Sequence, residues 1–374
     1  MRLVFSNYDS PANPYYAGGG ARAIHAIATR LAGANRHEVE VVTGSHPSAV
    51  DGKVDGVLYR HIGFRKAGPK IGQLLYQAAL PWALLRRQRN RGQSFDIWVE
   101  SLTPPFSTAF LPWFSRKPVI ALTQVMAGRA MRQKYGLPFD IVERFGLGQY
   151  PHGIALSGHL RRELLATNPR MCVRVIPNGV DGEIVRAPVA GTGREHILFL
   201  GRLDQEQKGL DLLLDALAAA GDELRTPIVI AGGGSADEVN WVHARAKALG
   251  LGERVRFPGR VEGEAKSRLF REARFMVMSS RFEASPLVLA EAFAYALPVV
   301  LFGIPELAEL SLDCTVQVPP FDVVRLGAAI RDLDRDENRR ERMGSAAKVF
   351  ARRFDWDDLA RQYEDFFESI LRSR

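Results

Sequence analysis

Short runs of apolar, β-forming residues recur along this chain, separated by stretches with helical spacing, and this rhythm constrains the fold more than any other feature. The first series lies at residues 3–5, 39–43, 96–100, 118–123, 153–157 and 173–178. Strands that are apolar on both faces are typical of a parallel sheet with helices on both sides. The first half of the chain is therefore expected to form one α/β domain.

The rhythm starts again after "PNGVDGEIVRAPVAGTG", a segment in which Pro, Gly and Asn cluster. The second series lies at 196–202, 227–234, 255–260, 274–280 and 297–303. A chain of 374 residues is also too long for one typical core. We therefore expect two doubly wound, Rossmann-like α/β domains, 1–178 and 179–355, with a last helix at about 356–374 that packs back on the first.

Ligands of open α/β sheets bind beyond the carboxyl ends of the strands. Two such domains that face each other leave a cleft between those ends. The chemistry of this chain is therefore expected in a cleft between its two domains.

Basic residues are concentrated in the first half of the chain. Residues 1–180 hold 23 Lys and Arg against 10 Asp and Glu, whereas the remainder holds 27 against 32. This asymmetry indicates an anionic partner for the first half. The segment 64–92 mixes Arg and Lys with Leu, Tyr and Trp. This segment either associates peripherally with an anionic membrane or forms a helix pair that packs on the sheet and has solvated arginines.

Cysteines are few, and the N-terminus lacks the apolar stretch of a signal peptide. Cys172 and Cys314 are the only two. Both observations favour a reducing cytoplasm. If the basic segment does contact a membrane, the contact is expected at the cytoplasmic face.

Two cations follow the first strand of the second series. Arg202 lies directly after it in "FLGRLDQEQKGLDLLL", and Lys208 comes six residues later, just before a helix. A guanidinium binds oxyanions as a fork and an ammonium acts as a compact charge, so together they can neutralise a diphosphate. A turn with two solvated cations is the other interpretation.

Two glutamates eight residues apart flank the start of a helix in "SSRFEASPLVLAEAF". Glu283 lies in a loop, and Glu291 lies two turns into the helix that Ser285 or Pro286 is expected to open. Carboxylates accept hydrogen bonds from sugar hydroxyls, and backbone N–H groups receive phosphate oxygens. The N–H groups between the two carboxylates belong to Ser285, Leu287 and Val288. The pattern indicates a site for a nucleotide sugar, unless both glutamates are simply solvated.

A glycine triplet, Gly18 to Gly20, precedes a run of good helix formers. A helix N-terminus without side chains can hold an anion, although a flexible loop has the same composition. The stretch also fits the pattern G-x-G-x-x-A of NAD-dependent oxidoreductases. That pattern follows the first strand directly and needs a carboxylate after the second strand. Here a loop intervenes and "VEVVTGS" ends without a carboxylate, which disfavours an oxidoreductase.

Five motifs occur together in a recognisable order: "VRVIPNGVD", "ILFLGRLDQEQKGLDLLLDAL", "IVIAGGG", "VRFPGRV" and "SSRFEASPLVLAEAFAYALPVV". In order and approximate spacing they resemble retaining glycosyltransferases of family 4, which have the GT-B fold. The resemblance covers about residues 173–310, and "PYYAGGGARAIHAIATRL" is similar to the N-terminal glycine loop of that family. The pair Glu-x7-Glu combined with GR…KG is its most specific part.

The resemblance implies transfer of a hexose or related sugar from a UDP- or GDP-linked donor to a hydroxyl acceptor, with retention at the anomeric carbon. The donor is a substrate, so no cofactor and no metal are implied. The acceptor would belong to polysaccharide, glycolipid or other glycoconjugate biosynthesis. The first domain would bind the acceptor and the second the nucleotide sugar.

The resemblance also implies roles for single residues. Arg202 and Lys208 would grip the donor diphosphate, and Glu283 would contact the donor sugar.

Glu291 would contact the ribose of the donor, and the backbone at Arg260 and Val261 would hold the nucleobase. Gly19 and Gly20 would let the N-terminal loop approach the phosphates.

The chain departs from the family at one position of consequence. The family often has a histidine where this chain has Gln124, whose role would be limited to hydrogen bonding. His25, His152 and His159 do not obviously replace it.

Other classes of protein remain as alternatives. A GT-B protein that binds a nucleotide sugar without transfer is one alternative, although the Glu-x7-Glu segment disfavours an epimerase. A nucleic-acid-binding protein would explain the basic half, but none of its sequence signatures occurs. Asp332, Asp334 and Asp336 could suggest a metal site, but they lie in a charged stretch expected to be a solvated helix face.

Overall fold

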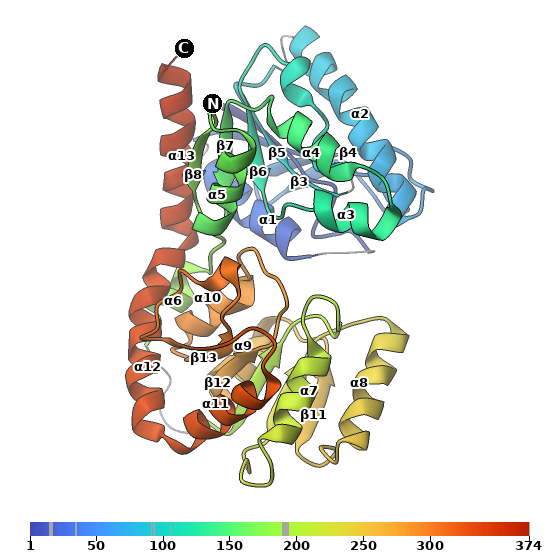
Figure 1. Ribbon diagram of the computed structural model, residues 1–374. Coiled ribbons are helices and arrows are strands. Elements are labelled where there is room, and N and C mark those ends of the chain that lie inside the picture. Colours follow the sequence, from blue (N-terminus) through green and yellow to red (C-terminus); the bar gives the residue numbers. More distant parts are fainter. Residues whose placement is uncertain are drawn as a thin grey trace. The chain divides into compact units, whose positions relative to one another are not determined.

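The computed structural model describes residues 1–14, 18–33, 36–90, 92, 94–104, 106–188 and 194–373. It divides into two compact units. Met1–Asn178 and Trp356–Arg374 form the N-terminal unit, and Gly179–Asp355 forms the C-terminal unit. Figure 1 shows each unit as a sheet with helices around it.

The N-terminal unit contains an eight-stranded sheet in the order β3-β4-β2-β1-β5-β6-β7-β8. The strands are β1 (Arg2–Ser6), β2 (Glu38–Gly44), β3 (Gly52–Val54), β4 (Val57–Ile62), β5 (Ile97–Ser101), β6 (Val119–Thr123), β7 (His152–Ala155) and β8 (Cys172–Val175). All neighbours pair in parallel except β3 and β4, which are antiparallel. The central strands β5 and β6 are buried along their whole length, as expected for a sheet covered on both faces.

Helices of the N-terminal unit connect these strands. They are α1 (Gly19–Ala32), α2 (Pro69–Arg89), the 3₁₀ turn η3 (Leu111–Trp113), α3 (Gly128–Tyr135), α4 (Phe139–Leu147), α5 (Gly158–Thr167) and α13 (Trp356–Arg372). Within the segment 64–92, Pro69–Arg89 forms one helix, α2, with Pro81 inside it, so the interpretation of this segment as a helix pair is wrong. The proline removes a single intrahelical hydrogen bond without ending the helix.

The last helix of the chain, α13, belongs to the N-terminal unit (Figure 1). Phe367 lies edge-on to Phe5 of β1, with ring centroids 6.5 Å apart. On α1, Arg30 binds Asp357 at 2.7 Å, and just before β2 His37 contacts Glu364 at 2.8 Å. An apolar stripe, the ion pair of Arg30 with Asp357 and the contact of His37 with Glu364 therefore fix α13 to the N-terminal unit.

The C-terminal unit contains a six-stranded sheet in the order β11-β10-β9-β12-β13-β14, with every pair parallel. The strands are β9 (His196–Leu200), β10 (Ile228–Ala231), β11 (Val255–Gly259), β12 (Ala273–Met278), β13 (Val299–Phe302) and β14 (Thr315–Val318). This is the doubly wound order, whose strand sequence reverses between β9 and β12. The crevice at that reversal is where such a sheet binds ligands.

The longest helices of the C-terminal unit are α8, α11 and α12. They are α6 (Gly182–Arg186), α7 (Leu210–Ala219), α8 (Ala236–Ala248), α9 (Gly263–Glu272), α10 (Leu287–Ala294), η4 (Pro305–Leu307), α11 (Val323–Arg335), α12 (Glu337–Phe350) and η5 (Ala351–Phe354). The helical stretch at the end of the chain is thus interrupted at Asp355, which forms a β-bridge with Val180. Among the described residues, no helix is long and apolar enough to cross a bilayer.

Candidate functional site

The two sequence constellations of the C-terminal unit meet at the reversal of its strand order. Lys208, in the loop after β9, forms an ion pair with Glu283, in the loop after β12. The hydroxyl of Ser280 donates to the same Glu283 oxygen at 2.7 Å. The side chains of Lys208 and Glu283 are only 14% and 5% exposed, so the pair lies inside the site rather than on its rim.

Asp204 shapes the loop that carries both cations. Its Oδ1 accepts hydrogen bonds from the backbone N of Gln207 at 2.7 Å and of Lys208 at 3.0 Å. Its Oδ2 lies 3.5 Å from Arg202 Nη2. Sequence reasoning missed this residue, although an aspartate three to four residues before backbone N–H groups in a turn is a usable signal.

The loop after β12 holds the loop after β9 in place. The guanidinium of Arg281 binds both carboxylate oxygens of Asp211 on α7, at 2.8 and 2.6 Å. Although partial burial acts in the opposite direction, this guanidinium lowers the pKa of the Asp211 carboxyl below its ordinary value. The hydroxyl of Ser279 donates to the Lys208 carbonyl at 2.9 Å. The position of Lys208 is therefore set by both loops.

Two glycines allow backbone segments to approach each other closely at the carboxyl ends of β9, β10 and β12. A Cβ on Gly209 would lie 2.2 Å from the carbonyl oxygen of Ser279, and a Cβ on Gly232 would lie 1.6 Å from that of Gly201. Both glycines also have positive φ, 62° and 156°. Side chains cannot be accommodated at either position, because the obstructing atoms are backbone.

Glu291 lies in the second turn of α10, as expected, but the start of this helix differs from the expectation. The N-cap is Pro286, without a side-chain hydrogen bond, and Leu287 is the first helical residue. Ser285 therefore precedes the cap position and does not cap α10. The first turn, with Leu287 and Val288, carries no acidic side chain, which leaves its N–H dipoles uncompensated by a carboxylate of the helix itself.

The Glu291 carboxylate has one oxygen bound and one available. Lys266 of α9 binds Oε1 at 2.5 Å, while Oε2 is buried and accepts no hydrogen bond from the described residues. A buried carboxylate oxygen without a donor is costly unless a ligand supplies one. This oxygen is thus suited to receive a ligand hydroxyl.

The end of β11 lies next to the glycines that follow β10. The N–H of Gly232 donates to the carbonyl of Gly259 at 2.8 Å. Arg260, just beyond it, donates from its guanidinium to the exposed Glu262 at 2.9 Å. Val261 follows Arg260 in the loop after β11.

In the N-terminal unit, α1 begins at Gly19 with Gly18 as its N-cap. The Gly18 N–H donates to the Asp9 carboxylate at 2.7 Å, so part of the expected anion site holds a carboxylate of the chain itself. The expected motif also includes residues 15–17, which lie outside the described part of the chain.

Gln124 follows β6 and lies directly against Gly20. A Cβ on Gly20 would fall 2.1 Å from Gln124 Oε1, and Gln124 Nε2 donates to Ser101 Oγ at 2.9 Å. The structure therefore places Gln124 beside the glycine start of α1. Sequence reasoning singled out both residues without linking them.

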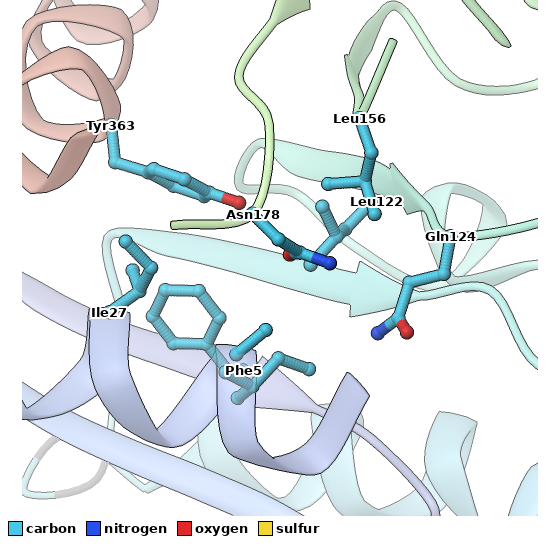
Figure 2. Close-up of a pocket in the computed structure, with 9 residues that line it drawn as sticks. Phe5, Ile27, Leu122, Gln124, Leu156, Asn178 and Tyr363 are labelled. Carbon is cyan, nitrogen blue, oxygen red and sulfur yellow. The ribbon is translucent and has the colours of Figure 1, made fainter. Parts of the chain in front are cut away.

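A small pocket extends inward from Gln124 (Figure 2). Its walls are apolar, with Phe5 and Leu122 from the sheet and Ile27 from α1. Figure 2 shows the amides of Gln124 and Asn178 and the ring of Tyr363 around it. Polar groups therefore lie around an otherwise apolar pocket at the carboxyl edge of this sheet.

The three histidines considered at the sequence level have other partners. His25 contacts the Tyr59 hydroxyl at 2.8 Å, the His152 ring lies edge-on to Phe366, and His159 lies 3.8 Å from Glu163. These contacts give each histidine a place in the packing of the N-terminal unit.

The aspartates of "RDLDRDENRR" do not form one solvated helix face. Asp334 is nearly buried and accepts hydrogen bonds from Thr226 at 2.8 Å and Arg274 at 2.9 Å. Asp336 caps α12 by accepting from the Arg339 N–H. The expectation of a solvated face is wrong for Asp334, because arginine and threonine on neighbouring elements satisfy its carboxylate.

Two family models match this chain. The model described as "Glycosyltransferase Family 4" matches residues 17–183, and the one described as "Glycosyl transferases group 1" matches residues 180–350. Together they span both units.

Known proteins are also similar to this chain, some in sequence and others in structure. The phosphatidyl-myo-inositol mannosyltransferase of Mycobacterium leprae is 33% identical over 208 residues, which are 53% of this chain and 54% of that protein. The match thus spans about half the length of that curated relative. The structure of sucrose-phosphate synthase from Thermosynechococcus elongatus superposes with a TM-score of 0.83 at 18% identity and covers 100% of both chains. HepE from Anabaena, solved in complex with UDP, gives a TM-score of 0.75 at 19% identity and covers 99% of this chain and 100% of its own.

Proposed function

The chain belongs to glycosyltransferase family 4 and has the GT-B fold, and from this premise we propose that it transfers a hexose or related sugar from a nucleoside-diphosphate sugar to a hydroxyl acceptor with retention of configuration. The observation that carries the proposal is the ion pair of Lys208 and Glu283 at the strand-order reversal of the C-terminal unit. This pair joins the two motifs that the donor needs, one for its diphosphate and one for its sugar.

Arg202 and Lys208 act on the leaving group in this proposal. The bond between the anomeric carbon and the diphosphate oxygen breaks, and negative charge develops on that oxygen. Cations held in advance at this place stabilise the charge without reorganisation. The Lys208 ammonium has three N–H donors, so it can keep its bond to Glu283 and donate to the diphosphate.

Retention follows if the acceptor attacks from the side on which the diphosphate leaves. A bond forms between the acceptor oxygen and the anomeric carbon, and the acceptor proton passes to the leaving phosphate oxygen. No side chain then has to serve as the base. Glu283 accepts hydrogen bonds from the donor sugar and so orients it for this attack.

The nucleotide occupies the edge formed by α10 and the loop after β11. The buried Oε2 of Glu291 receives a ribose hydroxyl, which replaces the missing hydrogen bond. The N–H groups of Ser285, Leu287 and Val288 receive phosphate oxygens. The backbone at Arg260 and Val261 holds the nucleobase.

The N-terminal unit is proposed to bind the acceptor. The M. leprae relative is named for an acceptor that is an inositol lipid, and the basic N-terminal half of this chain suits an anionic acceptor of that kind. The start of α1 has no side-chain cap, and beside the Gly18 N–H that binds Asp9 the N–H groups of Gly19 and Gly20 are proposed to bind an oxyanion. Gln124, beside Gly20, contributes amide hydrogen bonds in place of a histidine.

Thermal shift and product analysis test the proposal. UDP, GDP and ADP, alone and as sugar conjugates, are added to the purified protein, with NAD as the control ligand. A ligand at a hundred times its Kd stabilises the native state by about 2.7 kcal/mol, so one nucleoside diphosphate is expected to raise Tm and NAD is not. NMR of the glycosidic product then gives its anomeric configuration. Stabilisation by NAD alone, or an inverted product, would overturn the proposal.

A further inference from the structure

The N-terminal unit carries a band of exposed aromatic and basic side chains on and around α2, η3 and α4, which we call the aromatic–basic surface. Its apolar members are Trp82, Trp113, Phe114, Ile141 and Phe145, and its cations are Arg86, Arg89, Arg116 and Arg144.

Hydrogen bonds and ring contacts join the three elements of this surface. Gln88 of α2 donates to the carbonyl of Phe114 at 3.1 Å. The Trp113 indole donates to Gln149 Oε1 at 3.0 Å, and its ring lies edge-on to Phe145 of α4, with centroids 5.5 Å apart. These contacts place the end of α2, η3 and α4 next to one another.

The apolar side chains of this surface are largely open to water. Trp82 is 73% exposed, Trp113 55% and Phe145 57%. Ile141 precedes Phe145 by four residues and so lies on the same face of α4. Exposed apolar residues that gather in one place, with polar residues around them, mark a surface that another body covers.

Acidic groups are almost missing around this surface. Between Gly63 and Phe139 the sequence contains only Asp96 and Glu100. Asp96 is paired with Lys117, and Glu100 is buried.

The acidic side chains of α4 do not compensate Arg86, Arg89 and Arg144 of this surface. On α4, Asp140 is bound by Arg132 at 2.9 Å and Glu143 is buried. Within the described residues, Arg86, Arg89 and Arg144 form no ion pair.

We propose that the aromatic–basic surface docks on an anionic phospholipid bilayer. Trp113, Ile141 and Phe145 enter the boundary between headgroups and acyl chains, where the amphipathic indole is favoured. The arginines reach lipid phosphates while their aliphatic stems lie along the apolar part. The inference rests on the proposed function in one respect, because a lipid-anchored acceptor would bring the enzyme's substrate to the bilayer surface.

Sedimentation with vesicles tests the proposal on the full chain. Vesicles of phosphatidylcholine alone and of phosphatidylcholine mixed with phosphatidylglycerol are compared at low and high salt. Binding is expected to the mixed vesicles only and to weaken at high salt. The triple variant Arg86→Glu, Arg89→Glu, Arg144→Glu should bind at least about tenfold more weakly. The matched control, Arg225→Glu, Arg342→Glu, Arg352→Glu in the C-terminal unit, should bind as the parent does.

Tryptophan fluorescence separates insertion from simple charge attraction. Mixed vesicles should shift the emission of the protein to shorter wavelength, and Trp113→Phe should remove part of that shift. Ile141→Ser with Phe145→Ser should weaken binding without changing net charge.

Absence of binding at low salt, or equal binding by the two charge variants, would overturn the proposal. So would capture of a partner protein by this surface with no affinity for vesicles. Nucleotide-induced thermal shifts, measured without vesicles, report on the donor site alone, so failure of the docking proposal and failure of the transferase proposal are distinguishable.

Discussion

The ammonium of Lys208 lies against the carboxylate of Glu283, and the contact joins two loops whose residues are 75 positions apart in the sequence. Both side chains are nearly buried, and Ser280 donates a further hydrogen bond to the same carboxylate oxygen. A nearly buried ion pair of this kind is costly to break from one side only. Removal of either side chain alone should therefore leave the other charge buried without its partner.

Lys208→Ala is expected to lose both activity and stability. It removes a cation from the leaving group, so transfer should fall by about a thousandfold or more. It also leaves Glu283 buried without its partner, which should cost about 2–3 kcal/mol in the free energy of unfolding. Initial rates and denaturant melts measure the two effects. Arg245→Ala is the matched control, because it breaks the more exposed pair with Asp215 and should cost less than about 1 kcal/mol.

Arg202→Ala is expected to lose activity alone. The Arg202 side chain is 68% exposed, so its removal should leave Tm almost unchanged. Transfer should still fall by about a hundredfold or more, because the lost guanidinium stabilises the departing diphosphate. A variant with parental turnover would show that Arg202 has no part in the reaction.

Glu283→Gln should separate sugar handling from nucleotide affinity. The amide can still accept the hydrogen bond from Ser280, so the loop keeps its shape, but the negative charge is gone. We expect kcat with the sugar nucleotide to fall by about tenfold or more, while Kd for the free nucleoside diphosphate stays within about threefold. Calorimetry with the nucleotide and initial rates with the donor measure the two quantities. Loss of nucleotide affinity alone would assign Glu283 to the nucleotide instead.

Much of this architecture could be predicted from the sequence, because buried strands carry a strong signal. Every apolar run identified at the sequence level overlaps a strand of the structure. The strands that were missed are β3, β4 and β14. Two of them are edge strands, β3 and β14, and β4 has a half-exposed pattern. Such strands lack the continuous apolar run that identifies a central strand.

The proximity of the candidate site residues could be predicted to the extent that it depends on strand order. Arg202 and Lys208 follow β9, Glu283 follows β12, and the doubly wound order makes these strands neighbours. What sequence could not supply were contacts that depend on side-chain conformations in loops. Asp204 is the clearest case, because its two backbone hydrogen bonds to the loop exist only in the folded turn.

Gly209→Ala should disrupt the donor loop, whereas Gly221→Ala should be tolerated. Both glycines have positive φ, 62° and 73°, so both substitutions pay a similar conformational strain. Only at Gly209 would the new methyl group meet backbone, 2.2 Å from the Ser279 carbonyl oxygen, while nothing lies near Gly221. We expect Gly209→Ala to cost about 2 kcal/mol more in stability than Gly221→Ala, as measured by chemical denaturation. Equal losses of stability would mean that the loop of Gly209 can move away from the Ser279 carbonyl without a cost in free energy.

The buried carboxyl of Glu100 makes the N-terminal unit sensitive to pH. Burial raises its pKa to about 7, against the effect of hydrogen bonds from Tyr150 and Ala109. A carboxyl whose pKa is raised on folding stabilises the native state fully below its unfolded pKa, and this contribution is lost as pH rises through the folded value. The free energy of unfolding should therefore fall by about 3 kcal/mol between pH 4.5 and 7.5 through this group. Glu100→Gln cannot ionise, so denaturant melts at several pH values should show its stability relative to the parent rising over that interval. A constant difference between the two proteins would show that Glu100 ionises equally in the folded and unfolded chain.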